Sequence, residues 1–529
     1  MPAPTELPDR PFEAMLRIPS QLRLFATVLL LAILLAAAAT AQVQPASVFG
    51  DHMVLQRDKP IAVWGTAAAK EEVRVTLDEK SVTTTANEQG RWLVHLEAHA
   101  AGGPFTLRCA GSNEVVLHDV LVGEVWICSG QSNMNWSMAR SDDTLDVLPE
   151  ATDRQLRILR LPNKAHAKPQ LATTAEWQLA TESTLSSFSA VGYGFGRHLR
   201  EHHDVPIGLV QTAWGGTRAE AWMREDALRQ HEVTRPILAR WQATAKRYPK
   251  AKQRFDQALK QWQVEATAAK AEGKKAPRRP RAPAGPNDRH APGRLFHGMV
   301  QPLLPMSIRG VIWYQGEANA GRAYQYRTLF PAMIRDWRDA FGQGHFPFLF
   351  VQLASFESRG SHPHTWPELR EAQTMALSEP NTGMACTIDL GAKNNIHPPH
   401  KLEVGRRLAL LARAGTYGEA IVPSGPMYSH YTIERSQVRL FFDHVGAGLV
   451  AKGGELVGFE VATEDGAFQK ATARIDGNQV LVQHADIAAP RYVRYAWSNW
   501  PSYSLFNQDG LPASSFRTDS RKGVTAEAR

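Results

Sequence analysis

The sequence predicts a central α/β domain built on a parallel sheet, with a β-domain before it and another after it. Between residues 120 and 420, short apolar runs alternate with longer helix-forming segments, which is typical of a parallel sheet covered by helices. On both sides of this region, short strand-like runs follow one another, which is typical of antiparallel β structure. A chain of 529 residues is also too long for a single hydrophobic core.

Residues 1–41 have the pattern of a secretory signal peptide and are not expected to belong to the fold. Arginines precede an apolar run over 24–38, and the small residues at 39–41 fit a cleavage site. The apolar run is short and rich in alanine, which makes it a poor membrane span. Met15 is an alternative start of the chain. We therefore expect a secreted or periplasmic protein without a membrane span, whose mature chain starts near Gln42.

Residues 42–119 are expected to form the N-terminal β-domain, a small antiparallel sandwich. Its strands are predicted at 61–64, 72–76, 92–95, 105–108 and 115–118. The region contains no catalytic cluster, so it either binds carbohydrate or covers the next domain.

Residues 120–420 are expected to form the α/β domain. Its strands are predicted at 124–128, 207–211, 310–314, 346–352 and 384–390, and its helices at 190–203, 327–341, 367–377 and 400–414. Residues 421–529 return to strand-like runs and predict a C-terminal β-domain with a docked tail over 497–519. Its strands are predicted at 438–442, 456–462, 471–475, 480–483 and 492–496.

A basic insertion at 235–294 interrupts the α/β domain. It holds sixteen Lys/Arg and four Asp/Glu, a local charge of +12 within a chain of net charge +8. The rest of the chain is therefore slightly acidic, and we expect no nucleic-acid partner. Residues 240–275 favour helix, as in a helical hairpin, and 273–286 favour an extended loop. Because this insertion carries none of the polar segments described below, replacing 246–289 by a linker is expected to leave the chemistry intact.

The candidate nucleophile is Ser132. The buried-strand run 125–128 ends at a turn with Gly130, and a hydroxyl residue after a glycine at a strand end is where α/β enzymes present a nucleophile. Cys109, Cys128 and Cys386 form no spacing motif and are expected to be buried for structural reasons.

Four polar segments follow predicted strands of the α/β domain. They are 130–134 with a serine, 211–217 with a Gly-Gly turn, 313–319 with glutamine and asparagine, and 394–400 with a histidine. The carboxyl ends of parallel strands converge on one crevice, so these segments are expected to meet. Together they supply a nucleophile, a base and oxyanion donors, which are the groups that acyl transfer requires.

At these residues the chain resembles a sialate O-acetylesterase-type carbohydrate esterase of the SGNH/GDSL hydrolase superfamily. The resemblance covers nearly the whole mature chain except 235–294. It rests on FGDHMVLQR at 49, GQSNM at 130, GGTRAEAW at 215, WYQGEANAG at 313, RTLFPAMIRDWR at 327, IHP at 396 and GLPASSFRTD at 510. It implies an SGNH-hydrolase-like three-layer fold for the α/β domain.

The resemblance also implies the catalytic roles. Ser132 would be the nucleophile and His397 the general base and acid. The backbone N–H groups of Ser132 and Gly216 would form the oxyanion hole with a side-chain amide, and both Gln315 and Asn319 fit that third position.

The third member of the triad is where the chain departs from the pattern. Relatives often carry an aspartate two or three residues before the histidine, whereas this chain has Asn394 and Asn395 there. Either Asn395 or a carbonyl orients His397 in a dyad, or a carboxylate such as Asp389 or Glu317 serves instead.

The implied activity is removal of O-acetyl groups from sugars through an acetyl-serine, without metal or cofactor. Trp214, Glu317 and Arg322 are expected to contact the sugar. The acceptor would be sialic acid, with acetylated xylan or xyloglucan as the alternative. A catalytically weak carbohydrate-binding protein is the alternative of another class. The oligomeric state stays open.

Overall fold

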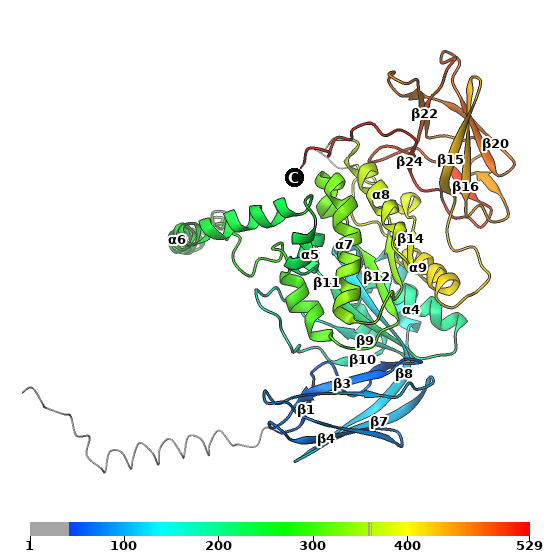
Figure 1. Cartoon of the computed structure of the whole chain (residues 1–529). Coiled ribbons are helices and arrows are strands. Elements are labelled where there is room, and N and C mark those ends of the chain that lie inside the picture. The colour runs from blue at the N-terminus through cyan, green and yellow to red at the C-terminus, as the bar shows by residue number, and fades with distance from the viewer. Residues whose placement is uncertain (1–41, 358–359, 361, 529) are drawn as a thin grey trace, which may run out of the picture.

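The computed structural model describes residues 42–528 apart from 358, 359 and 361, so the expected signal peptide lies outside the described residues. The architecture is mixed α/β. A mixed 11-stranded sheet occupies the middle, and smaller β-sheets lie at its two ends (Figure 1). Within the described ranges, no helix has both the length and the apolar composition needed to cross a membrane.

The N-terminal β-region consists of mostly antiparallel strands, with β2 parallel to β8, and it shares one core with the α/β region. β1, β3 and β6 form a separate sheet, whereas β4, β5 and β7 extend the large sheet through β8. The strands are β1 Gln44–Pro45, β2 Val54–Gln56, β3 Ile61–Thr66, β4 Glu72–Leu77, β5 Lys80–Thr85, β6 Arg91–Leu96 and β7 Gly102–Ala110. β5 is not expected from the sequence, because it is a largely exposed strand of Ser and Thr without apolar alternation.

β8, Glu114–Gly130, joins the two regions, and it corrects the prediction of separate strands at 115–118 and 124–128. Its first half pairs antiparallel with β7, and its second half pairs in parallel with β11 and β12. Asp119 adopts a left-handed conformation at φ 54° without ending the strand. No Gly-Pro or Asn-Gly turn signal separates the two halves, which explains the continuity.

The central sheet has the order β10-β9-β11-β8-β12-β13-β14. Its edge strand β10 pairs antiparallel with β9, and all the other strands in this order are parallel. Their bounds are β9 Asp153–Arg160, β10 Trp177–Ala180, β11 Ile207–Ala213, β12 Gly310–Tyr314, β13 Phe348–Val351 and β14 Thr382–Ala385. β9 and β10 are not expected from the sequence. The last predicted strand, 384–390, is wrong at its end, where Ile388–Leu390 is a 3-10 helix.

Helices cover both faces of this sheet. Trp126 of β8 packs on Phe195 of α4, whereas Trp313 of β12 packs on Phe330 of α7. Trp313 pairs with Ser129, three residues after Trp126, so the two tryptophans point to opposite faces. The helices are α2 Ser132–Asn135, α3 Glu182–Ser186, α4 Ala190–His202, α5 Glu225–Gln230, α7 Ala323–Phe341, α8 Thr365–Met375 and α9 Lys401–Gly415.

The insertion begins with a single helix, α6 Arg235–Ala271, and not with the predicted hairpin. No glycine, proline or asparagine interrupts 250–271, so the helix-favouring composition continues to its end. Only Ile237 and Leu238 of this helix are buried, and the helix projects away from the body (Figure 1). The loop after it turns back, and Trp262 donates a hydrogen bond to the carbonyl of Pro277 at 2.8 Å.

The C-terminal β-region has its own core, into which Cys386 and Ile388 also pack. Its strands are β15 Met427–Glu434, β16 Gln437–Asp443, β17 Leu449–Ala451, β18 Phe459–Ala462, β19 Gln469–Lys470, β20 Thr472–Asp476, β21 Gln479–Gln483, β22 Tyr492–Tyr495, β23 Leu505–Asn507 and β24 Phe516–Arg517. The tail docks on the α/β region, where Arg517 binds Glu371 at 2.8 Å. All three cysteines are free and buried, as predicted.

Candidate active site

Ser132 stands at the carboxyl end of the central strand. β8 lies between β11 and β12, and Ser132 begins the short helix α2 two residues after the strand ends. The turn requires glycine at position 130. Its φ is 134°, and a Cβ atom there would lie 2.1 Å from the carbonyl oxygen of Tyr314. The serine is half-buried and lies at the edge where the strands end.

The loop after β11 lies directly beside the serine. The Trp214 N–H donates to the carbonyl of Gly130 at 3.1 Å. A Cβ atom on Gly215 would lie 3.4 Å from the Cβ of Ser132. Gly216 is exposed with φ 72°. The two glycines therefore bring backbone amides close to the serine without a side chain in between.

Asn133 connects three of the four polar segments. Its Nδ2 donates to Glu317 Oε1 at 2.5 Å and to the carbonyl of Ile396 at 3.1 Å. Its Oδ1 accepts a hydrogen bond from Lys401 Nζ at 2.6 Å. Because Asn133 is buried, this amide fixes the histidine loop and the β12 loop relative to the turn that carries Ser132.

Lys401, which is buried, and Glu317, which is half-buried, bind the two ends of this amide. Burial lowers the pKa of Lys401 to about 7, although the charge of Glu317 opposes the shift. Burial raises the pKa of Glu317, against the hydrogen bond from Asn133 and the charge of Lys401. Glu317 Oε2 is buried and accepts no hydrogen bond from the described residues.

His397 reaches the same crevice and is held by its backbone and its ring face. The ring stacks on Trp136, with centroids 4.4 Å apart and planes at 24°. Its backbone N–H donates to Asn395 Oδ1 at 3.0 Å. Among the described residues, neither ring nitrogen of His397 makes a hydrogen bond, and neither does the Ser132 hydroxyl. Asn395 thus holds the backbone of His397 and does not contact its ring nitrogens.

The surroundings of His397 favour its neutral form. Burial, then Lys401 and Arg140, lower the pKa of this imidazole below its ordinary 6.5. The Arg140 guanidinium lies 3.8 Å from the centre of the Trp136 ring on which the histidine stacks. The neutral imidazole is the form that accepts a proton from a nucleophile.

This electrostatic setting predicts the pH profile. kcat/KM on a small acetyl ester is expected to fall as the pH drops through the lowered pKa of His397, so the acid limb lies below 6.5. Arg140→Gln removes a positive charge, which raises this pKa and moves the limb to higher pH. Arg281→Gln, an exposed charge change in the insertion, is the matched control. A limb that stays in place or moves down in Arg140→Gln would contradict this assignment.

The two candidate amides of the β12 loop differ in their hydrogen bonds. Gln315 donates to the carbonyl of Thr217 at 3.2 Å and to Asn319 Oδ1 at 2.7 Å, which uses both of its N–H groups. Asn319 donates to Glu220 Oε2 at 2.9 Å, which leaves its second N–H without a partner among the described residues. Asn319 therefore retains a free donor, whereas Gln315 does not.

Arg322, expected at the sugar, is bound inside the protein. Its guanidinium donates to Glu220 at 2.7 Å and to Gln325 at 2.8 Å. Burial opposes the ionisation of Glu220, but Arg322 and Asn319 outweigh it and lower the pKa of this carboxyl. Arg322 thus supports the carboxylate that in turn holds Asn319.

The two candidate carboxylates for the third position have other partners. Asp389 is bound by both terminal nitrogens of Arg407, at 2.6 and 2.7 Å. Glu317 is bound by Asn133, as described above. In the described part of the chain, neither carboxylate contacts His397.

The structure contradicts the expectation that the insertion stays away from the crevice. Arg289, near its end, lies with its guanidinium carbon 5.7 Å from the centre of the Trp214 ring. Its Nη2 lies 3.9 Å from the point where a Cβ atom on Gly216 would sit. Replacing 246–289 would therefore remove a residue at the candidate site.

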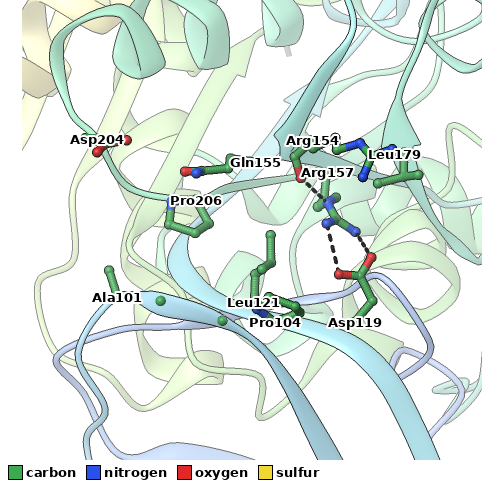
Figure 2. A pocket seen from close by; sticks show the side chains of 12 residues that line it. Ala101, Pro104, Asp119, Leu121, Arg154, Gln155, Arg157, Leu179, Asp204 and Pro206 are labelled. Atoms are coloured by element: carbon green, nitrogen blue, oxygen red, sulfur yellow. Dashed lines mark hydrogen bonds and ion pairs between the residues drawn. The ribbon is translucent and has the colours of Figure 1, made fainter.

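Two other features lie outside this crevice. A cavity of about 450 Å³ lies at the amino ends of the strands, where Arg157 binds Asp119 at 2.7 Å (Figure 2).

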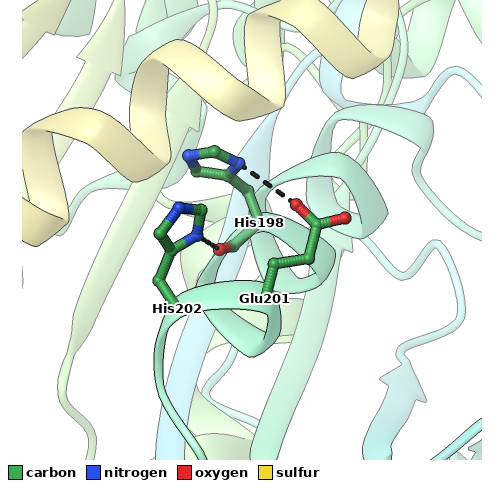
Figure 3. A group of neighbouring side chains, drawn as sticks. All are labelled: His198, Glu201 and His202. Carbon is green, nitrogen blue, oxygen red and sulfur yellow. Dashed lines mark hydrogen bonds and ion pairs between the residues drawn. The ribbon is translucent and has the colours of Figure 1, made fainter.

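His198, Glu201 and His202 of α4 gather with the spacing of metal ligands (Figure 3). Arg197 pairs with this glutamate, and Arg413 contacts His198, so these positive charges oppose a cation.

Sequence reasoning missed Asn133, Lys401 and Arg289 as parts of the site. Lys401 could have been found from the sequence. A cation in the first turn of a helix is electrostatically unfavourable, so its presence there indicates a specific partner. Asn133 is part of the GQSNM motif but was assigned no role from the sequence. Nothing in the local sequence distinguishes Arg289 from the other arginines of the insertion.

Comparisons with known proteins show which proteins the chain is similar to. A family described as carbohydrate esterase, sialic acid-specific acetylesterase, matches residues 122–267 and 292–413. The sialate O-acetylesterase of Rattus norvegicus is 31% identical over 510 residues, covering 86% of this chain and 90% of that protein. The Homo sapiens sialate O-acetylesterase is 29% identical over 518 residues, covering 86% and 88%. The crystal structure of a carbohydrate acetylesterase from Xanthomonas citri is 39% identical with a TM-score of 0.78, covering 90% of this chain and 100% of that chain.

Proposed function

The chain belongs to the family of sialic acid-specific acetylesterases among the carbohydrate esterases, and we propose on this premise that it removes O-acetyl groups from sialic acid through an acetyl-Ser132 intermediate. Family membership makes the protein a carboxylic ester hydrolase, with O-acetylated carbohydrate as its substrate. The observation that carries the proposed mechanism is the meeting of the Ser132 turn, the β12 loop and the His397 loop around Asn133.

In the proposed first step, His397 accepts the hydroxyl proton of Ser132 as the serine oxygen attacks the acetyl carbonyl carbon. The N–H groups of Ser132 and Gly216 and the free N–H of Asn319 stabilise the oxyanion that forms. When the tetrahedral intermediate collapses, the bond from the acetyl carbon to the sugar oxygen breaks, and His397 returns the proton to that oxygen. Water then attacks acetyl-Ser132 by the same route and releases acetate.

We propose a dyad in which the Trp136 ring orients His397 by stacking and Asn395 fixes its backbone. We also propose that the α/β region has the three-layer fold of the SGNH hydrolases. The parallel sheet between α4 and α7 supports this assignment. Export to the periplasm or the medium, through residues 1–41, is the proposed localisation.

The proposed dyad predicts that Asn395 contributes little to kcat. Asn395→Ala is expected to lower kcat by about tenfold or less, because it loses one backbone contact and no proton-transfer partner. Asn395→Asp is expected to be tolerated, since a carboxylate there stabilises the imidazolium. The measurement is kcat on an acetyl ester for both variants. An Asn395→Ala variant as inactive as one lacking the nucleophile would show that the asparagine itself orients the base.

The third oxyanion donor gives another prediction. Asn319→Ala is expected to lower kcat by about 10²-fold with little change in KM, as for loss of one oxyanion donor. Steady-state kinetics measures kcat and KM separately, and thermal unfolding verifies that the variant is folded. A variant with wild-type kcat would remove Asn319 from the oxyanion hole.

The acceptor is tested by a substrate panel. O-acetylated sialic acids, acetylated xylan and acetylated xyloglucan are offered under the same conditions, and released acetate is measured. The proposal expects the highest kcat/KM on acetylated sialic acid. A preference for xylan or xyloglucan would replace it by an esterase of plant cell-wall polysaccharide, and binding without turnover would indicate a carbohydrate-binding protein.

A further inference from the structure

Arg289 belongs to a stretch that the family match leaves out. The matched ranges end at residue 267 and resume at 292. The return segment of the insertion is nevertheless fixed to the body. Gly285 packs against the ring of Tyr248 in α6, and Arg294 binds Glu225 at 2.8 Å. This chain therefore brings a residue of its own insertion to the crevice on an anchored support.

The guanidinium of Arg289 is exposed beside the groups that would hold the reacting ester. It lies over the Trp214 ring and next to Gly216, whose N–H is a proposed oxyanion donor. Its Nε points to His290 Nε2 at 3.4 Å. Among the described residues, Arg289 forms no ion pair with a carboxylate, so its charge is available to a ligand.

The surroundings hold more positive than negative charge. The side chain of Arg218, two residues after Gly216, also forms no ion pair or hydrogen bond with the described residues, and only its backbone carbonyl accepts a hydrogen bond, from Ala221. Both terminal nitrogens of Arg240 are buried and lack a hydrogen-bond partner in the described structure. The nearby carboxylate of Glu220 is already bound by Arg322 at 2.7 Å. An anion brought next to Gly216 would therefore meet the unpaired guanidinium of Arg289, with the unpaired side chain of Arg218 two residues further along the chain.

We propose that Arg289 and Arg218 form an anion subsite for the carboxylate of an acidic O-acetylated sugar, which makes Arg289 a specificity-determining residue contributed by the insertion. The inference rests on the proposed function. A guanidinium binds a planar carboxylate through two parallel N–H groups, so the subsite would select charged over neutral acceptors and orient the ring beside Ser132.

The test compares one acetylated acidic sugar, O-acetylated sialic acid, with its neutral methyl ester. Arg289→Gln is expected to lower the ratio of kcat/KM on the acid to kcat/KM on the methyl ester by about tenfold, mostly through a higher KM for the acid. The discrimination of the wild type between acid and ester is expected to weaken with added salt. Arg281→Gln, the same charge change on an exposed residue of the same loop, is the matched control and should match the wild type.

A second readout does not need turnover. Calorimetry measures the dissociation constant of sialic acid that lacks the acetyl group. Arg289→Gln is expected to raise this constant about tenfold, and Arg289→Lys is expected to give a value between those of the wild type and Arg289→Gln. Equal losses on acid and ester, or an unchanged dissociation constant for the acid, would overturn the subsite. Absence of hydrolysis of every acetyl ester by the wild type would overturn the proposed function instead, while the calorimetric comparison still decides the role of Arg289.

Discussion

Replacing Ser132 by alanine is expected to abolish acetate release, with a loss in kcat of about 10⁴-fold or more. The hydroxyl would supply the nucleophile in the proposed mechanism, and alanine has no group to replace it. The fold is expected to persist, because the Ser132 hydroxyl makes no hydrogen bond within the described residues. The measurements are kcat on 4-nitrophenyl acetate and on an acetylated sugar, with thermal unfolding to compare stability.

Ser137 is the matched control for this variant. It lies five residues further on, is also half-buried, and its hydroxyl makes no hydrogen bond in the described structure. Ser137→Ala is expected to retain most of the wild-type rate. If Ser132→Ala kept more than about a tenth of the wild-type kcat, the nucleophile assignment would be wrong.

Replacing His397 by alanine is expected to lower kcat by about 10³-fold or more, because the serine loses the group that accepts and returns its proton. His400 is exposed in the same segment and offers a matched control, since His400→Ala removes an imidazole that makes no hydrogen bond, ion pair or ring contact with the described residues. The measurement is kcat across the pH range for both variants. An active His397→Ala variant together with an inactive His400→Ala variant would move the base to the other histidine.

The sequence was sufficient to predict the parts of the fold that local pattern controls. The central parallel strands are apolar runs that end in polar segments, so the positions of Ser132, Gly216 and His397 at one edge follow from the order of strands and helices. The continuity of β8 was not predictable in the same way. The strand passes from an antiparallel to a parallel environment, and no local residue marks that change.

The parts of the site that the sequence did not predict depend on contacts between distant segments. Lys401 reaches Asn133 across 268 positions of the chain, and the pair matters only because both are buried together. Arg289 reaches Gly216 because the insertion returns along α6, whereas composition alone predicts a solvated loop. Neither contact follows from residue type or periodicity.

Trapping the acetyl group tests the central claim most directly. The enzyme is mixed with excess 4-nitrophenyl acetate, quenched in acid within the first turnovers, digested, and examined by mass spectrometry. The mechanism predicts a burst of nitrophenol and one acetyl group on the peptide that contains Ser132, absent from Ser132→Ala. An acetyl group on another residue during a matching burst, or an unchanged burst in Ser132→Ala, would contradict it.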